Sequence, residues 1–128
     1  MWSATPVSRP PAAHRFAEVE DSRGGVVQPV GELGVEASDA LRGAIHSALS
    51  DGGGPVVLDL SQVVFMDSTA LSVVLASLRE AWARGQALLV SGPLEPPIAS
   101  LFAITGLDRF VTIHESRDVA FAAASAEA

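Results

Sequence analysis

A carboxylate followed by two hydroxyls, Asp67, Ser68 and Thr69, is the part of the chain best suited to chemistry. The triplet comes directly after the apolar residues 63–66 and directly before a segment of helical periodicity. Ser68 is therefore expected at a helix N-terminus, where unpaired backbone N–H groups and the helix dipole favour negative charge. The spacing leaves two interpretations open. In the first, Asp67 or Ser68 acts only as the helix N-cap and contributes about 1 kcal/mol to stability. In the second, the Ser68 hydroxyl has a function of its own.

Enzymatic chemistry is not expected at this serine. The chain has no cysteine and no lysine, which excludes thiolate nucleophiles, cysteine-based metal sites and Schiff bases. The histidines, His14, His46 and His114, are isolated and do not have the spacing of a metal-binding motif. Ser68 is not in a G-x-S-x-G turn, and a triad with His114 and a carboxylate would need residues far apart in sequence. We therefore expect no enzyme, no metal site and no cofactor.

The composition indicates one globular domain that does not bind nucleic acid directly. The chain has 128 residues, of which 48% are hydrophobic, and this is enough for a substantial core. The net charge of −7 argues against nonspecific binding to nucleic acid or anionic membranes. No apolar stretch is long enough to span a membrane, and the N-terminus does not resemble a signal peptide. The expected location is the cytoplasm.

Periodicity and turn residues predict an α/β domain over residues 14–126, preceded by a flexible tail over residues 1–13. A mixed, mostly parallel sheet of about five strands should be flanked by about four helices, with an antiparallel hairpin first. Asp59, in the most apolar run, is expected to be a strand-end carboxylate bound by a backbone N–H or an arginine. The expected strands are 14–20, 26–32, 56–60 continuing to 63–66, 87–90 and 110–113, and the expected helices are 36–50, 68–84, one opening at the prolines 93–97 and ending by 106, and one beginning near 116.

The helix over 68–84 should have one buried face and one exposed face. The residues expected to be buried are Leu71, Val74, Leu75, Leu78 and Trp82. Those expected on the opposite face are Thr69, Ser72, Val73, Ala76, Glu80 and Ala83.

Three segments in order resemble the STAS domains, the family of bacterial anti-sigma factor antagonists. Residues 65–71, Phe-Met-Asp-Ser-Thr-Ala-Leu, are similar to the family's strand followed by an Asp-Ser-Ser/Thr-Gly-Leu turn. Gly31-Glu32-Leu33 is similar to the Gly-Glu-Leu-Asp that follows its second strand. Ile98, Leu101, Phe102, Thr105-Gly106-Leu107 and Phe110 are similar to its third helix and the next turn. The resemblance covers about residues 14–126.

The resemblance implies a single STAS domain that acts as a binding switch. The partner would be an anti-sigma factor with serine kinase activity, and binding it would release a sigma factor. Phosphorylation of Ser68 would switch this binding off, and the chain would be a monomer or a weak dimer. The implied partner-binding residues are Gly31, Glu32, Asp67, Ser68, Thr69, Ser72, Val73 and Ala76.

Two positions depart from the family pattern. Gly34 stands where the family usually has an acidic residue near the serine, and Ala70 stands where it usually has glycine. A methyl group at position 70 would narrow the close approach of a kinase. These departures motivate an alternative, a STAS module that does not switch and that belongs to a lipid-transport or signalling scaffold assembly.

Overall fold

The computed structural model, which describes residues 16–17 and 19–127, has the predicted α/β architecture. The tail expected over residues 1–13 lies outside the described residues. The strands are β1 (Phe16–Ala17), β2 (Gly25–Pro29), β3 (Gly31–Leu33), β4 (Val56–Asp59), β5 (Val63–Met66), β6 (Leu88–Ser91) and β7 (Ile113–His114). The helices are α1 (Ser38–Ser50), α2 (Ser68–Ala83), α3 (Pro96–Ile104) and α4 (Arg117–Glu127), with short 3-10 turns η3 (Val35–Ala37) and η4 (Leu107–Arg109).

The main sheet is mixed, as predicted, with the order β1-β2-β4-β6-β7. β1 is antiparallel to β2, and the pairs β2–β4, β4–β6 and β6–β7 are parallel. The apolar run expected to continue from 60 to 66 is instead interrupted by a turn, so that β5 leaves the main sheet and pairs with β3. Asp59 stabilises this turn by accepting a hydrogen bond from the Ser61 N–H at 3.0 Å.

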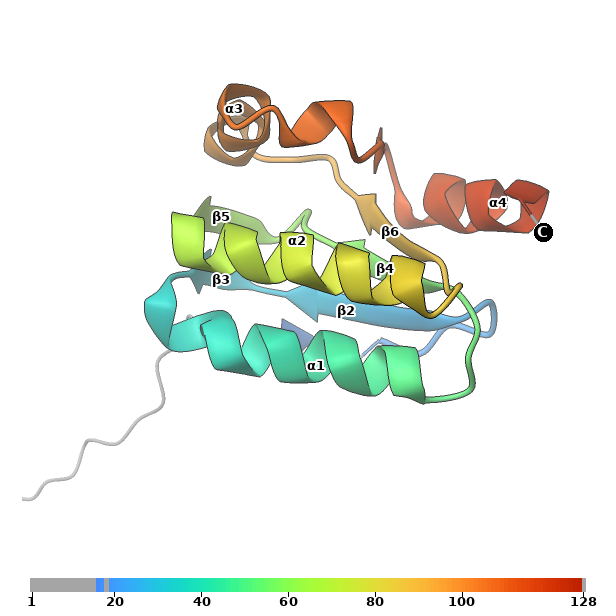
Figure 1. The fold of residues 1–128 in the computed structure, drawn as a ribbon. Coiled ribbons are helices and arrows are strands. Elements are labelled where there is room, and N and C mark those ends of the chain that lie inside the picture. The colour runs from blue at the N-terminus through green and yellow to red at the C-terminus, as the bar shows by residue number, and fades with distance from the viewer. Residues whose placement is uncertain (1–15, 18, 128) are drawn as a thin grey trace, which may run out of the picture.

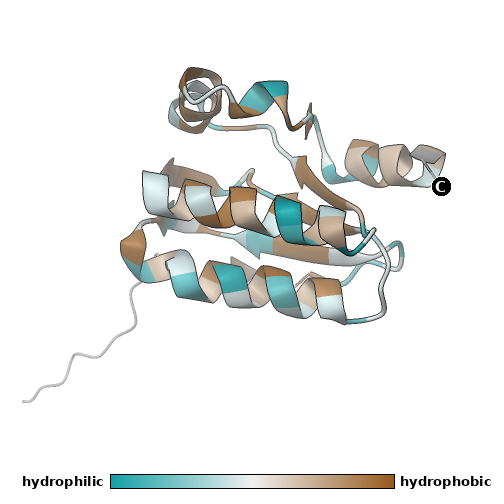
Figure 2. Cartoon of the chain, viewed as in Figure 1, coloured by the Kyte–Doolittle hydropathy of each residue, from teal (hydrophilic) through white to brown (hydrophobic). Residues whose placement is uncertain are grey.

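Helices cover the sheet on both faces (Figure 1). α1 and α2 pack side by side on one face, and α4 lies on the other. Ala120 and Phe121 of α4 form a small buried cluster with Val57 and Leu89 of the sheet. Figure 2 shows hydrophobic residues along the strands, whereas α1 alternates between hydrophobic and hydrophilic positions. This alternation is the reason that α1 buries only one face.

Asp59 is bound as predicted. Its side chain is buried, with 4% exposed, at the end of β4. Besides the Ser61 N–H, its carboxylate accepts hydrogen bonds from Arg117 Nη2 at 2.9 Å and Gln28 Nε2 at 3.0 Å. The carboxylate therefore ties the start of α4 to the centre of the sheet.

The predicted orientation of α2 was wrong at Trp82 and Val73, whereas Leu71 and Val74 are buried as predicted. Trp82 is 87% exposed rather than buried, and Val73 is 1% exposed rather than on the surface. The helix packs through a face that contains small residues, which let it lie close to the sheet and to α1. A tryptophan at position 82 falls at the border of that face. The buried residues of α2 are Ala70, Leu71, Val73, Val74, Ser77 and Ala81.

Candidate functional site

Asp67, and not the neighbouring Ser68, is the N-cap of α2. Asp67 has an extended backbone, and its Oδ1 accepts a hydrogen bond from the Ala70 N–H at 3.0 Å. Ser68 is the first residue of the helix, and its side chain is exposed. Of the two capping residues that the sequence left open, the structure thus selects Asp67. The Ser68 hydroxyl lies at the helix N-terminus, where an added negative charge is favoured.

The loop after β3 lies directly against this turn. The Asp67 N–H donates to the Leu33 carbonyl at 3.1 Å, and a Cβ placed on Gly34 would lie 3.6 Å from Asp67 Oδ2. Figure 1 shows the ends of β3 and β5 and the starts of α1 and α2 at one end of the molecule. Position 34 therefore faces the Asp67 carboxylate, and an acidic residue there would add a second negative charge beside Ser68.

Most of the predicted partner-binding residues are accessible around this turn. Ser68, Thr69, Ser72, Ala76 and Glu32 are exposed, and Gly31 and Asp67 are partly buried. Val73 is the exception, because it belongs to the core.

The structure adds apolar residues that the sequence analysis missed. Val35 is 67% exposed, Val64 is 53% exposed, and Phe65 is 48% exposed and pairs with Glu32 across the β3–β5 ladder. Their apolar character pointed to burial. Val64 and Phe65 lie on the surface because β5 packs outside the main sheet, and Val35 lies in the turn η3. We call Val35, Phe65, Ser68 and Glu32 the helix-start surface.

The Ala70 methyl group does not restrict access to this surface. Ala70 is fully buried, because its Cβ points into the core rather than toward solvent. A glycine would therefore leave the outline of the surface unchanged at this position. Of the two departures from the family pattern, Gly34 alone alters the charge beside Ser68.

Ser68 has no catalytic partner in the part of the chain that the structure describes. No hydrogen bond joins its hydroxyl to a histidine or a carboxylate within residues 16–17 and 19–127, and no group of three metal-ligating side chains is found there. His46 instead bonds Glu80 between α1 and α2, with Nδ1 3.0 Å from Oε2. This contact with His46, and secondly one with Arg84, lowers the pKa of Glu80.

No helix in the described segments is long and apolar enough to cross a lipid bilayer.

Comparison with known proteins gives one family match and several similar structures. Residues 16–113 match the family model "Mlab, STAS domain". The fold is similar to an anti-sigma factor antagonist from Mycobacterium paratuberculosis, with 28% identity, a TM-score of 0.77 and coverage of 91% of this chain and 97% of that chain.

Two more distant structures share the fold. One is the phosphorylated form of SpoIIAA, a Bacillus cell fate determinant, with 23% identity, a TM-score of 0.61 and coverage of 81% and 95% of the two chains. The other is a sulfate transporter family protein from Wolinella succinogenes, with 17% identity, a TM-score of 0.69 and coverage of 85% and 90%.

Proposed function

The chain belongs to the STAS-domain family, and from its similarity to an anti-sigma factor antagonist of known structure we propose that it has the same role. In this proposal the unmodified chain binds an anti-sigma factor that is also a serine kinase, and a sigma factor is released. Phosphorylation of Ser68 ends the binding. The antagonist from Mycobacterium paratuberculosis, similar over 91% of this chain, supports the role, and the phosphorylated Bacillus protein supports the modification.

One observation carries the proposal: the Ser68 hydroxyl is exposed at a helix N-terminus that Asp67 already caps. A phosphoryl group there would meet free backbone N–H groups and the positive end of the helix dipole. The fold should therefore tolerate the modification. The cap would keep its geometry, since Asp67 and not Ser68 accepts the hydrogen bond from the Ala70 N–H.

The same modification would weaken an interface built on the helix-start surface. A phosphoryl group adds a charge of about −1.5 to −2. That charge would lie near the exposed Phe65 and Val35, which a partner would cover with apolar groups. Burying it there without a matching cation costs free energy. A loss of about 2–3 kcal/mol weakens binding roughly 30- to 150-fold, enough to change partners.

The test is phosphorylation of the full chain by its kinase partner, followed by mass spectrometry and calorimetric titration. We expect phosphate on Ser68, and none on the folded Ser68→Ala variant, which should bind the partner constitutively. Thr69→Ala, the matched control with the neighbouring hydroxyl removed, should still be phosphorylated. Phosphate on Thr69 alone would refute the site assignment.

Gly34 favours a second candidate, a STAS module that binds without switching. With no carboxylate at position 34, the charge pattern beside Ser68 differs from that of the antagonists. The backbone of Gly34 is extended, with φ −102°, so Gly34→Asp should fold. If a kinase active on another substrate phosphorylates neither the wild type nor Gly34→Asp, the non-switching module is the better description. If the kinase phosphorylates Gly34→Asp but not the wild type, the missing carboxylate at position 34 is what distinguishes a non-switching module from a switching antagonist.

A further inference from the structure

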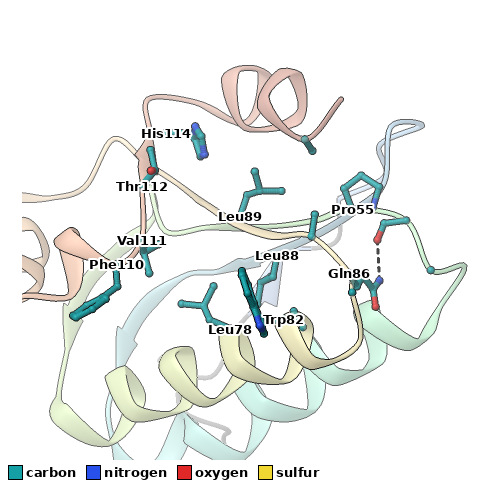
Figure 3. A pocket seen from close by; sticks show the side chains of 16 residues that line it. Pro55, Leu78, Trp82, Gln86, Leu88, Leu89, Phe110, Val111, Thr112 and His114 are labelled. Atoms are coloured by element: carbon teal, nitrogen blue, oxygen red, sulfur yellow. Dashed lines mark hydrogen bonds between the residues drawn. The ribbon is translucent and has the colours of Figure 1, made fainter. Parts of the chain in front are cut away.

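A groove of about 860 Å³ runs along the C-terminal half of α2. Leu78 and Trp82 of α2 form one wall, Leu88 of β6 and Val111 form the floor, and Phe110 lies on the other side (Figure 3). The lining contains no aspartate, glutamate or arginine, and His114 is its only titratable side chain. The groove is therefore an apolar surface rather than a site for a charged small molecule.

The groove lies at an edge of β6 that no helix covers in the described residues, because β7 pairs with Val90 and Ser91 and not with Leu88 or Leu89. α1 and α2 lie side by side over the sheet, whereas the nine-residue α3 packs near β5 through Ile98 and Phe102. Figure 1 shows α3 beyond the end of the sheet and α4 on the opposite face. The groove reaches past this edge to Leu89 and to Ala124 of α4, so it lies between α2 and α4.

Two aromatic side chains on opposite sides of the groove are almost fully exposed. Trp82 is 87% exposed and Phe110 is 84% exposed. Large aromatics are enriched where proteins bind one another, and leaving them in water forgoes the free energy of burying their apolar surface. Their place beside an apolar groove matches the way an amphipathic helix is held, with its apolar face inserted between such side chains.

The charges next to the groove indicate the chemistry of the occupant. Within residues 16–17 and 19–127, four arginines form ion pairs with carboxylates, namely Arg23, Arg42, Arg84 and Arg117. The other two in these ranges, Arg79 and Arg109, have no ion pair. Arg79 lies three residues before Trp82 on the same side of α2, and Arg109 directly precedes Phe110. Each is exposed. Glu80, which directly follows Arg79, is already paired with His46 and Arg84, and the exposed Asp108 directly precedes Arg109.

We propose that the groove binds an amphipathic helix of another protein, apolar on one face and acidic along its flanks. The flanking carboxylates would pair with Arg79 and Arg109, while the apolar face covers Trp82 and Phe110. Trp82 lies fourteen residues after Ser68, about 21 Å along the helix axis. The groove is thus separate from the helix-start surface, and both could be occupied at once.

The experiment uses the full chain carrying Trp2→Phe, so that Trp82 is the one remaining tryptophan. The probe is a synthetic peptide of about 18 residues with leucines on one helical face and glutamates on both flanks. A matched peptide carries lysines in place of the glutamates. We expect the acidic peptide to shift the Trp82 emission to the blue with saturation, and the basic peptide to bind about tenfold more weakly.

Variants separate the contribution of charge from that of the apolar surface. Arg79→Gln with Arg109→Gln should weaken binding of the acidic peptide about tenfold, whereas Asp108→Asn should strengthen it about twofold. Circular dichroism should show that both variants are folded, because these side chains are exposed.

Three results would overturn the proposal. The first is equal binding of the two peptides, or binding of neither. The second is a blue-shifted Trp82 in the isolated monomer, which would mean that the chain fills its own groove. The third is a dimer in sedimentation whose formation shifts the Trp82 emission, which would make a second copy the occupant.

Discussion

At the scale of single residues, the exposure of Trp82 has a direct consequence for stability. Because its ring is 87% exposed, Trp82→Ala should change the free energy of unfolding by less than about 0.5 kcal/mol. Phe102, which is 1% exposed, is the matched comparison, and Phe102→Ala should cost about 3–5 kcal/mol. Urea denaturation of both variants measures the difference. A Trp82→Ala loss as large as that of Phe102→Ala would show that the tryptophan is buried in solution.

At the same scale, we predict that Asp67 stabilises the start of α2 and that Ser68 does not. Asp67→Ala removes the N-cap of α2 and should destabilise the fold by about 1 kcal/mol. Ser68→Ala is the control one residue away and should be nearly neutral, because no hydrogen bond from its side chain is found in the described part of the chain. A comparison of the urea-unfolding midpoints of the two variants with that of the wild type measures both effects. The reverse order of effects would make Ser68 the cap and remove the argument for a free hydroxyl.

At the scale of elements, we expect α4 to depend on the partly buried ion pair between Asp59 and Arg117. Asp59→Asn removes the charge that Arg117 contacts at 2.9 Å, and should cost about 1–3 kcal/mol. Hydrogen exchange should become faster in α4 than in α1, because only α4 is tied to the sheet through this carboxylate. Asp39→Asn, which loses an exposed ion pair with Arg42, should leave exchange and stability almost unchanged. If Asp59→Asn leaves hydrogen exchange in α4 no faster than in α1, the carboxylate does not have this role.

The limits of sequence reasoning are clearest in α2. The start and end of this helix could be predicted, because Asp67 and Gly85 mark its limits, but its rotation could not. Leucine, valine and tryptophan at helical spacing define an apolar stripe, yet the helix buries Ala70, Ser77 and Ala81. Small side chains contribute little hydrophobicity to a periodicity count, and they are favoured where two helices and a sheet approach closely. The predicted buried face was therefore rotated about the helix axis relative to the observed one. This rotation placed Val73 in the predicted partner surface.

At the scale of the whole molecule, local patterns predicted the elements but not their arrangement. Turn residues and periodicity gave the alternating strands and helices, and Asp59 was predicted to bind an arginine or a backbone N–H. The order of strands and the placement of α3 depend on packing between segments far apart in sequence. The pattern of residues within a short segment does not specify this packing. The groove beside α2 follows from the placement of α3 and was therefore not predictable. The helix-start surface was predicted in part, since Ser68 and Glu32 lie on it but Phe65 was expected inside.

The last prediction concerns acid, and it tests how the N-terminal hairpin is joined to the C-terminal helix. Arg23 bonds Asp21 at 2.7 Å and Asp118 at 2.9 Å, and it lies over the Phe121 ring at 4.6 Å from the centroid. The side-chain hydrogen bond from Arg23 is the main cause that lowers the pKa of Asp21 to about 2. A carboxyl whose pKa falls on folding stabilises the folded state above its unfolded pKa, about 4, and loses this contribution as the pH falls toward 2.

Wild-type stability should therefore decline between pH 4 and pH 2 more steeply than that of Asp21→Asn, which has no charge to lose there. Urea unfolding at pH 7, 4 and 2.5 measures the two slopes. Asp51→Asn, at the exposed end of α1, is the control and should follow the wild-type slope. Parallel slopes for the wild type and Asp21→Asn would mean that this contact does not couple the two ends of the domain.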